Sequence, residues 1–303
     1  MPTTSRTARG LLVRPALFGL LLTAAPLAPA HLAATGPHPG TLLRHDGLTI
    51  VVPPRGRGVW AEAILADGSI RVLGVQTAAD GTVRVLPGGG AAAQSPSGVR
   101  PLSPSISPPA CSDSAYSLYP SSWNKTYTWY FNATSTPSGI SQTAATGALK
   151  SAANNITTAN NDCGLPDLVS ATNAYKATTT RTPNISNSAS CLSGDGTNVV
   201  GFGTLSSIYV GYTCWWSIGN ATVEADAKLN KANYTWYVTK PVGCSNKYDV
   251  QAVATHEFGH VFGLGDLDEA THANLTMSQV IYACQNSEDT LGLGDILGLQ
   301  SKY

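Results

Sequence analysis

The chain has 303 residues, with 18 Lys and Arg against 18 Asp and Glu, so its formal net charge is zero and only 12% of its residues are charged. A neutral chain without a basic run offers no field for phosphates or for an anionic membrane surface, which excludes nucleic-acid binding by charge. Asn, Ser and Thr supply much of the polarity instead. That composition suits a secreted protein.

The first thirty residues have the features of a signal peptide. Arginines precede an apolar block at residues 16–25, and the small residues Ala-Pro-Ala follow at 28–30. A membrane-spanning helix needs about 20 apolar residues, and this block is shorter. We therefore expect residues 1–30 to be removed and the mature protein to be secreted, with no membrane contact afterwards; a retained anchor is the alternative.

Residues 31–86 predict a small β-rich module without cysteine. Short β-like runs are separated by hairpin signals such as Asp67-Gly68 and Asp80-Gly81; the runs are 48–52, 59–65, 70–75 and 83–86. Residues 88–109 are rich in Gly, Ala, Ser and Pro, a composition typical of a linker. The domain boundary is therefore expected near residue 110.

All six cysteines lie after that boundary, at positions 111, 163, 191, 214, 244 and 284. An even number in an exported chain predicts three disulfides, whose pairing the sequence does not choose. Cys163 lies in Cys-Gly-Leu-Pro-Asp, which resembles the cysteine switch of some metalloprotease zymogens. A switch cysteine must precede the first strand of a catalytic domain, and Cys163 follows one, so we interpret it as a disulfide partner.

The order of elements after residue 110 predicts an α+β fold. A strand at 126–132 places Tyr127, Trp129 and Phe131 on one face, and apolar residues then recur at helical spacing. The further expected elements are a long helix at 138–160, strands at 199–202, 208–216 and 222–229, and helices at 250–263 and 288–300. In the strand at 222–229 apolar and polar residues alternate, which predicts one exposed face.

The motif HExxHxxGxxD spans residues 256–266. Residues four apart on a helix share a face, so His256 and His260 can direct ring nitrogens at one Zn²⁺. Glu257 projects beside the metal, where its carboxylate can accept a proton from bound water. Gly263 lets the chain turn and bring Asp266 in as the third ligand. Three protein ligands leave a fourth position open, as in catalytic zinc sites.

Other third ligands remain open at this point. Asp268 and His272 follow the motif closely, and Glu288 is a more distant candidate. The only methionine besides Met1 is Met277, which lies eleven residues after Asp266 by the numbering.

The chain from about residue 126 to its end resembles the metzincin zinc metalloproteases, and among them the matrixins, with an aspartate third ligand similar to that of the snapalysins. The resemblance rests on the motif, on Glu-Ala-Asp at 224–226, on the sequence leading into His256, and on residues 293–300. It implies a metzincin-like catalytic domain with a twisted mixed sheet, a long helix, an active-site helix and a C-terminal helix, and it makes Met277 the methionine-turn residue. It also makes Asp295 the carboxylate that braces that turn.

The resemblance implies a monomeric, secreted zinc endopeptidase that acts on protein or peptide substrates, with Glu257 as general base and residues 111–303 as its catalytic domain. Because a secreted protease needs latency, residues 31–110 are expected to be a propeptide and its linker. The rivals are a zinc-bearing surface-binding protein without proteolytic activity and a hydrolase of cell-wall peptide amides. The His-rich loop of the matrixins is missing, and residues 193–198 are a candidate Ca²⁺ loop or a plain turn.

Overall fold

A computed structural model describes residues 36–45, 47–64, 70–86 and 109–303 of the chain. The predicted signal peptide at 1–30 and most of the predicted linker lie outside the described residues. None of the described helices is long and apolar enough to cross a membrane.

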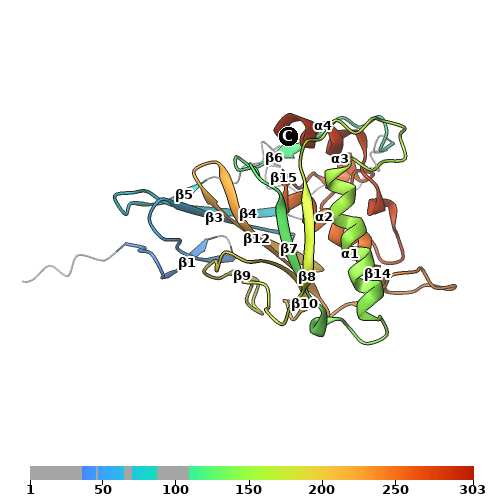
Figure 1. Ribbon diagram of the computed structural model, residues 1–303, viewed down its shortest axis with the longest axis horizontal. Helices are drawn as coiled ribbons and strands as arrows, with labels where there is room; N and C mark the ends of the chain where they lie inside the picture. Colours follow the sequence, from blue (N-terminus) through green and yellow to red (C-terminus); the bar gives the residue numbers. More distant parts are fainter. Residues whose placement is uncertain (1–35, 46, 65–69, 87–108) are drawn as a thin grey trace, which may run out of the picture. The chain divides into compact units, whose positions relative to one another are not determined.

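An eight-stranded mixed sheet forms the centre of the described chain (Figure 1). Its strands, in spatial order, are β5 (Val83–Leu86), β4 (Ile70–Thr77), β3 (Arg57–Ile64), β11 (Gly211–Ile218), β12 (Ala221–Asn230), β10 (Asn198–Gly203), β7 (Tyr127–Asn132) and β8 (Asn173–Thr178). From β12 to β8 neighbouring strands are parallel, whereas β11 and the three strands beyond it pair antiparallel. The sheet is therefore mixed, as the α+β prediction requires.

Three smaller sheets complete the strands of the described residues. They join β1 (Leu42–His45), β2 (Leu48–Val51) and β9 (Ser190–Cys191); β13 (Thr235–Tyr237) and β14 (Lys247–Asp249); and β6 (Ser117–Leu118) and β15 (Leu264–Gly265). The last pair is antiparallel and fixes the chain directly after the HExxH helix.

The three predicted helices are present, and a side-chain hydrogen bond marks the start of each. Helix α1 (Gln142–Thr157) begins where the Ser141 side chain accepts the N–H of Ala144. Helix α2 (Val250–Val261) begins where Asp249 accepts the N–H of Gln251. Two short 3₁₀ helices, η1 (Ala133–Ser135) and η2 (Ser287–Asp289), and the short α-helix α3 (Glu269–His272) also occur.

The C-terminal helix starts later than predicted. Helix α4 covers Leu293–Lys302 rather than 288–300, because Thr290 and Gly292 are extended and separate it from η2. The carboxylate of Asp295 accepts the N–H of Gly292 and so caps the first turn.

Aromatic packing fixes α2 against the sheet. Tyr127, Trp129 and Phe131 are all fully buried, as the alternation predicts. Trp129 and Tyr127 contact the ring of Phe258 on α2, and Tyr127 also contacts Phe262. Asn155 on α1 donates a hydrogen bond to Thr255 on α2. The HExxH helix thus packs against both the sheet and α1.

The prediction of a half-exposed strand at 222–229 is wrong. Glu224, Asp226 and Lys228 are all buried, because residues 184–199 fold over that face of β12. The Asp226 carboxylate accepts the N–H groups of Asn184 and Val199, which replaces water as its hydrogen-bonding partner.

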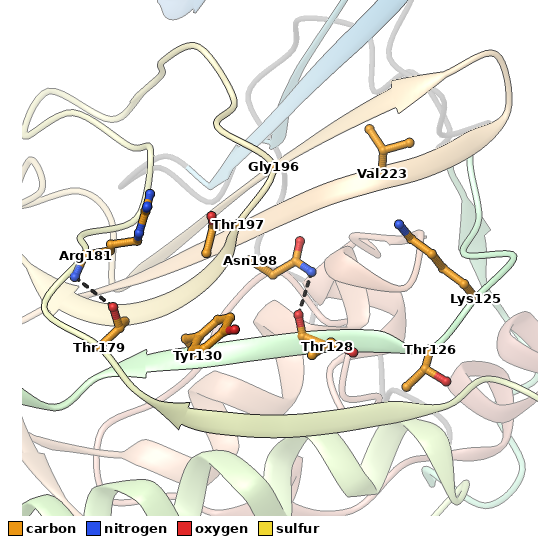
Figure 2. A pocket seen from close by; sticks show the side chains of 10 residues that line it. All are labelled: Lys125, Thr126, Thr128, Tyr130, Thr179, Arg181, Gly196, Thr197, Asn198 and Val223. Carbon is orange, nitrogen blue, oxygen red and sulfur yellow. Dashed lines mark hydrogen bonds between the residues drawn. The ribbon is translucent and has the colours of Figure 1, made fainter.

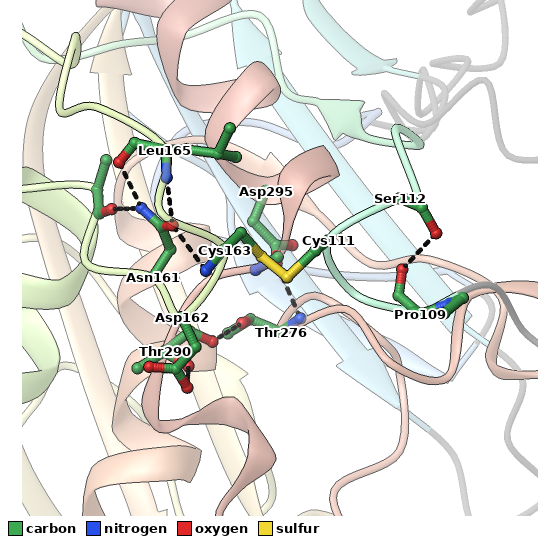
Figure 3. The surroundings of a disulfide bond; sticks show 12 residues. Pro109, Cys111, Ser112, Asn161, Asp162, Cys163, Leu165, Thr276, Thr290 and Asp295 are labelled. Carbon is green, nitrogen blue, oxygen red and sulfur yellow. Dashed lines mark hydrogen bonds between the residues drawn. A yellow bond between two sulfur atoms is a disulfide. The ribbon is translucent and has the colours of Figure 1, made fainter.

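All six cysteines form disulfides, as predicted. The pairs are Cys111–Cys163, Cys191–Cys214 and Cys244–Cys284. Cys163 is therefore a disulfide partner, and Figure 3 shows its bond to Cys111 beside Asn161 and Asp162. Disulfides of this kind are expected in an oxidising compartment.

The strands predicted in the N-terminal module also occur, and three of them belong to the main sheet. Strand β3 pairs antiparallel with β11, so that Trp60 lies opposite Trp215. The two indole rings are parallel, with centroids 6.4 Å apart, and Tyr119 packs against both. Residues before and after the predicted linker thus share one core.

Candidate metal centre

The two histidines of the motif meet on one face of α2. Their Nε2 atoms lie 3.1 Å apart, as the four-residue spacing predicts. After the helix, Gly263 adopts a left-handed conformation with φ of +85°, and its N–H donates to the carbonyl of His260. This turn brings Asp266 back, so that Oδ1 lies 3.0 Å from Nε2 of His256 and 3.4 Å from Nε2 of His260.

The hydrogen bonds of the two rings identify the atoms that face the centre. Nδ1 of His256 lies 2.8 Å from the carbonyl oxygen of Thr276, and Nδ1 of His260 lies 3.0 Å from that of Leu264. A carbonyl only accepts, so each Nδ1 carries the proton, and each Nε2 is left as the metal-binding atom.

The donor set fits a divalent cation. Both side-chain oxygens of Asp266 are buried and accept no hydrogen bond of ordinary geometry from the described residues. Such acceptors are costly to bury unless a cation or proton lies between them and the histidine nitrogens. Within the part of the chain that the structure describes, His256, His260 and Asp266 are the one group of His, Cys, Asp or Glu found close enough to share a metal ion.

The electrostatics of the centre favour a positive charge at the same point. Burial lowers the pKa of His256, but Asp266, the charge of Glu257 and the carbonyl of Thr276 together outweigh burial and raise this pKa to about 9. Burial and the neighbouring His256 lower the pKa of His260 to about 4. The added proton of His256 therefore occupies Nε2, where a metal ion would displace it.

Glu257 lies beside the ligands with its carboxylate fixed from the sheet. The hydroxyl of Thr213 on β11 donates to Oε2 of Glu257 over 2.5 Å. Burial raises the pKa of Glu257 to about 7, although the charge of His256 opposes this shift. A Cβ atom on Gly211 would lie 2.1 Å from Oε1 of Glu257, so this glycine makes room for the carboxylate.

A cavity of about 310 Å³ opens next to His256 and Glu257. Apolar and tyrosine side chains supply much of its wall, together with the chain after Met277; the lining residues are Ser207, Ile208, Tyr209, Val210, Gly211, Tyr234, Tyr248, Val253, His256, Glu257, Gln279, Val280 and Ile281. The candidate base and one ligand therefore border a space that can hold a side chain.

Met277 and Asp295 lie under the ligands. A Cβ atom on Gly259 would be 2.2 Å from Sδ of Met277, so the methionine packs directly against α2 between the two histidines. The carboxylate of Asp295 accepts the N–H groups of Thr276 and Met277, and Figure 3 shows the bond to Thr276. This arrangement fixes the carbonyl of Thr276 that orients His256.

The rival third ligands lie elsewhere. Asp268 accepts the N–H of Ala270 at the start of α3. His272 lies 2.8 Å from the carboxylate of Asp113, and Glu288 accepts a hydrogen bond from Ser287. Of the candidates from the sequence, the structure brings only Asp266 to the two histidines.

Sequence reasoning missed two buried residues at this centre. Thr213 is one, and Glu62 on β3 is the other. Oε2 of Glu62 lies 3.1 Å from Nδ1 of His260, and Oε1 accepts the N–H of Asp266. Burial raises the pKa of Glu62 well above its usual range, and the charge of Asp266 adds to the shift. A glutamate within the apolar run at 59–65 was the available signal.

Hydrogen bonds to protein groups hold the candidate calcium loop at 193–198 in place. Glu224 accepts the backbone N–H groups of Asp195 and Gly196 and the side-chain amide of Asn184. Its carboxylate oxygens thus bind the loop directly.

A second cavity, of about 520 Å³, lies on another part of the main sheet and shares no lining residue with the first (Figure 2). Polar side chains of β7, of the chain just before it and of the chain after β8 line it, including Lys125 before β7 and Arg181 after β8. Arg181 is already paired with Asp195.

Comparison with known proteins gives no match, either to a family model or to a curated protein.

Proposed function

We propose that the chain is a secreted zinc-dependent endopeptidase of metzincin type. The observation that carries the proposal is the convergence of three buried metal-binding atoms, from His256, His260 and Asp266, beside the carboxylate of Glu257. Two imidazoles and one carboxylate are a donor set typical of catalytic zinc. The predicted signal peptide and the three disulfides support an extracellular location.

The residues of the site suit hydrolysis of a peptide bond. Zinc, when bound, acts as a Lewis acid toward water and the peptide carbonyl. Glu257 accepts the proton of the attacking water and returns it to the nitrogen of the broken C–N bond. In the metal-free chain burial raises the pKa of this carboxyl to about 7, in the direction that favours return of the proton to the leaving nitrogen. Thr213 holds Oε2, which leaves Oε1 for the transfers.

The cavity beside Glu257 supports a polymeric substrate rather than a small ion. Its walls include Ile208, Val253 and Ile281, so we expect it to hold an apolar side chain next to the bond that is cleaved.

The test is Glu257→Gln in the secreted full chain, assayed with casein and analysed for bound zinc. The variant should keep zinc, because Glu257 is not a ligand, and should lose activity at least about a hundredfold. Treatment with a chelator should abolish wild-type activity, and added zinc should restore it.

Three outcomes would contradict the proposal. Casein hydrolysis by Glu257→Gln at the wild-type rate would exclude Glu257 as the base. Zinc binding without casein hydrolysis would favour the cell-wall hydrolase if purified peptidoglycan is cleaved, and the non-proteolytic binding protein if it is not.

A further inference from the structure

The feature that the proposed mechanism does not use is Glu62, a buried glutamate from the N-terminal module. Only 2% of its side chain is exposed. One carboxylate oxygen lies 3.1 Å from Nδ1 of His260, and the other accepts the backbone N–H of Asp266 over 3.1 Å. A single side chain thus contacts both the second and the third proposed ligand.

The position of Glu62 follows from strand pairing. Trp60 lies opposite Trp215 in the β3–β11 pair. Side chains alternate along a strand, so Glu62 shares the face of Trp60, and Thr213 shares that of Trp215. Thr213 reaches Glu257 from this face, and Glu62 reaches His260. Two adjacent strands therefore approach the metal centre together.

Glu62 contacts His260 on the side away from the proposed metal. The ring binds metal through Nε2, which faces His256 and Asp266, whereas Glu62 lies at Nδ1. A segment that blocked the centre would place a group among the Nε2 atoms. Glu62 instead lies on the other side of the ring, where Oε1 accepts the N–H of Asp266. Oε2 makes no hydrogen bond of ordinary geometry with the described residues, because Nδ1 of His260 donates to the carbonyl of Leu264.

The strand that carries Glu62 is also buried in the core on both of its faces. Trp60 is 3% exposed and lies between Tyr119 and Trp215. On the other face of the sheet, Val59 and Ala61 are fully buried in a cluster with Cys214 and Trp216. Loss of β3 would uncover both groups.

We propose that Glu62 is a positioning residue for Asp266, packed beside the ring of His260, and that the module that carries it stays with the working protein. The proposal rests on the proposed metal site. It gives the module a role different from that of a removable propeptide.

The first test measures metal binding to the full chain. Purified wild-type protein, Glu62→Gln and Glu62→Ala are titrated with Zn²⁺ against a chromophoric chelator, and with Co²⁺ for the visible spectrum. Zinc affinity should fall about 10- to 100-fold in both variants, and the Co²⁺ bands should shift because the ligands are less well oriented. Glu62→Gln keeps the shape of the side chain, so it remains informative if Glu62→Ala does not fold.

Glu224→Gln is the matched control, because Glu224 is another buried glutamate of the same sheet that bonds backbone N–H groups but contacts no proposed ligand. It should keep wild-type zinc affinity. Equal affinity in wild type and both Glu62 variants, with an unchanged Co²⁺ spectrum, would overturn this proposal and leave the proposed function standing. Failure of the wild type to bind zinc would overturn the proposed function as well.

The second test determines which residues the zinc-loaded, active protein from the culture medium contains. Intact mass and peptide mapping after gel filtration should find Glu62, either in one chain or in a fragment that co-elutes with the rest. A fully active, zinc-loaded species that starts near Cys111 and lacks this fragment would overturn the proposal.

Discussion

The hydroxyl of Thr213 on β11 donates a hydrogen bond to Oε2 of Glu257 on α2, across the interface between sheet and helix. It is the side-chain hydrogen bond that fixes the candidate base, and it favours the charged carboxylate, so it lowers the pKa of Glu257 against the effect of burial.

Thr213→Val should therefore raise the pKa of Glu257 and leave the carboxylate less well oriented. Since the base acts unprotonated, the acidic limb of the pH–rate profile should move to higher pH. Turnover at neutral pH should fall about tenfold, the order of one hydrogen bond to a charged group. Peptide hydrolysis between pH 5 and 9 measures both effects. Thr213→Ser keeps the hydroxyl and should behave like wild type; a profile of Thr213→Val that overlays the wild type would disprove the role.

Metal binding should stabilise the folded chain. A ligand that binds only the folded state at a free concentration a thousand times its Kd adds about 4 kcal/mol to the free energy of unfolding. Thermal unfolding of chelator-treated protein, with and without zinc, measures this gain. Asp266→Ala should lose most of the gain, whereas Asp268→Ala, which changes the rival residue at the start of α3, should keep it. The reverse result would make Asp268 the third ligand.

Gly259→Ala should destabilise the protein although alanine favours helices. The new methyl group would lie 2.2 Å from Sδ of Met277, so the methionine must move or α2 must shift. We expect a loss of roughly 1 to 3 kcal/mol, typical of overpacking in a core. Gly147→Ala on α1 is the control, because no atom lies within 4 Å of its Cβ position, and it should gain about 0.5 to 1 kcal/mol. Urea unfolding of both variants decides; a stabilised Gly259→Ala would contradict the packing of Met277.

Asp249 makes the stability of the metal-free protein depend on pH. Burial raises its pKa from 3.8 to about 7, and the charges of Asp289 and Glu288 add to this, against the N–H groups of Gln251 and Ala252. Because the folded pKa is above the unfolded one, the folded state binds more protons between about pH 4 and 7. This contribution to stability is therefore lost as pH rises through that window.

Asp249→Asn cannot ionise and still caps α2. The free energy of unfolding of Asp249→Asn minus that of wild type should therefore be larger at pH 8 than at pH 4.5. Urea unfolding of chelator-treated protein at the two pH values measures this difference. Asp249→Ala also loses the cap. Its free energy of unfolding should therefore be about 1 kcal/mol below that of Asp249→Asn at both pH values. Parallel pH curves for wild type and Asp249→Asn would refute the assignment.

Local spacing predicted the elements and ligands that depend on neighbouring residues. Periodicity alone predicts the helices α1 and α2 and the burial of Tyr127 and Phe131. It also predicts the approach of His260 to His256. The six paired cysteines follow from their number.

Contacts between distant segments could not be read in this way. Asp266, whose N–H Glu62 accepts, lies about 200 residues later in the chain. The register in which β3 pairs with β11 is not indicated by the sequence of either strand. The burial of Glu224 and Asp226 has the same cause, since the loop that covers them comes from another part of the chain. Polar residues on a strand indicate exposure only while no other segment binds them.

The disulfide Cys244–Cys284 closes a loop that contains the three candidate ligands His256, His260 and Asp266, together with Glu257 and Met277. A single cut anywhere within that loop leaves the two pieces covalently joined. Under the endopeptidase function that we propose, the protein would be released among copies that can attack such loops. The crosslink therefore means that one internal nick cannot separate Asp266 from its two histidines by dissociation, so that self-digestion has to break the chain twice before a ligand is lost.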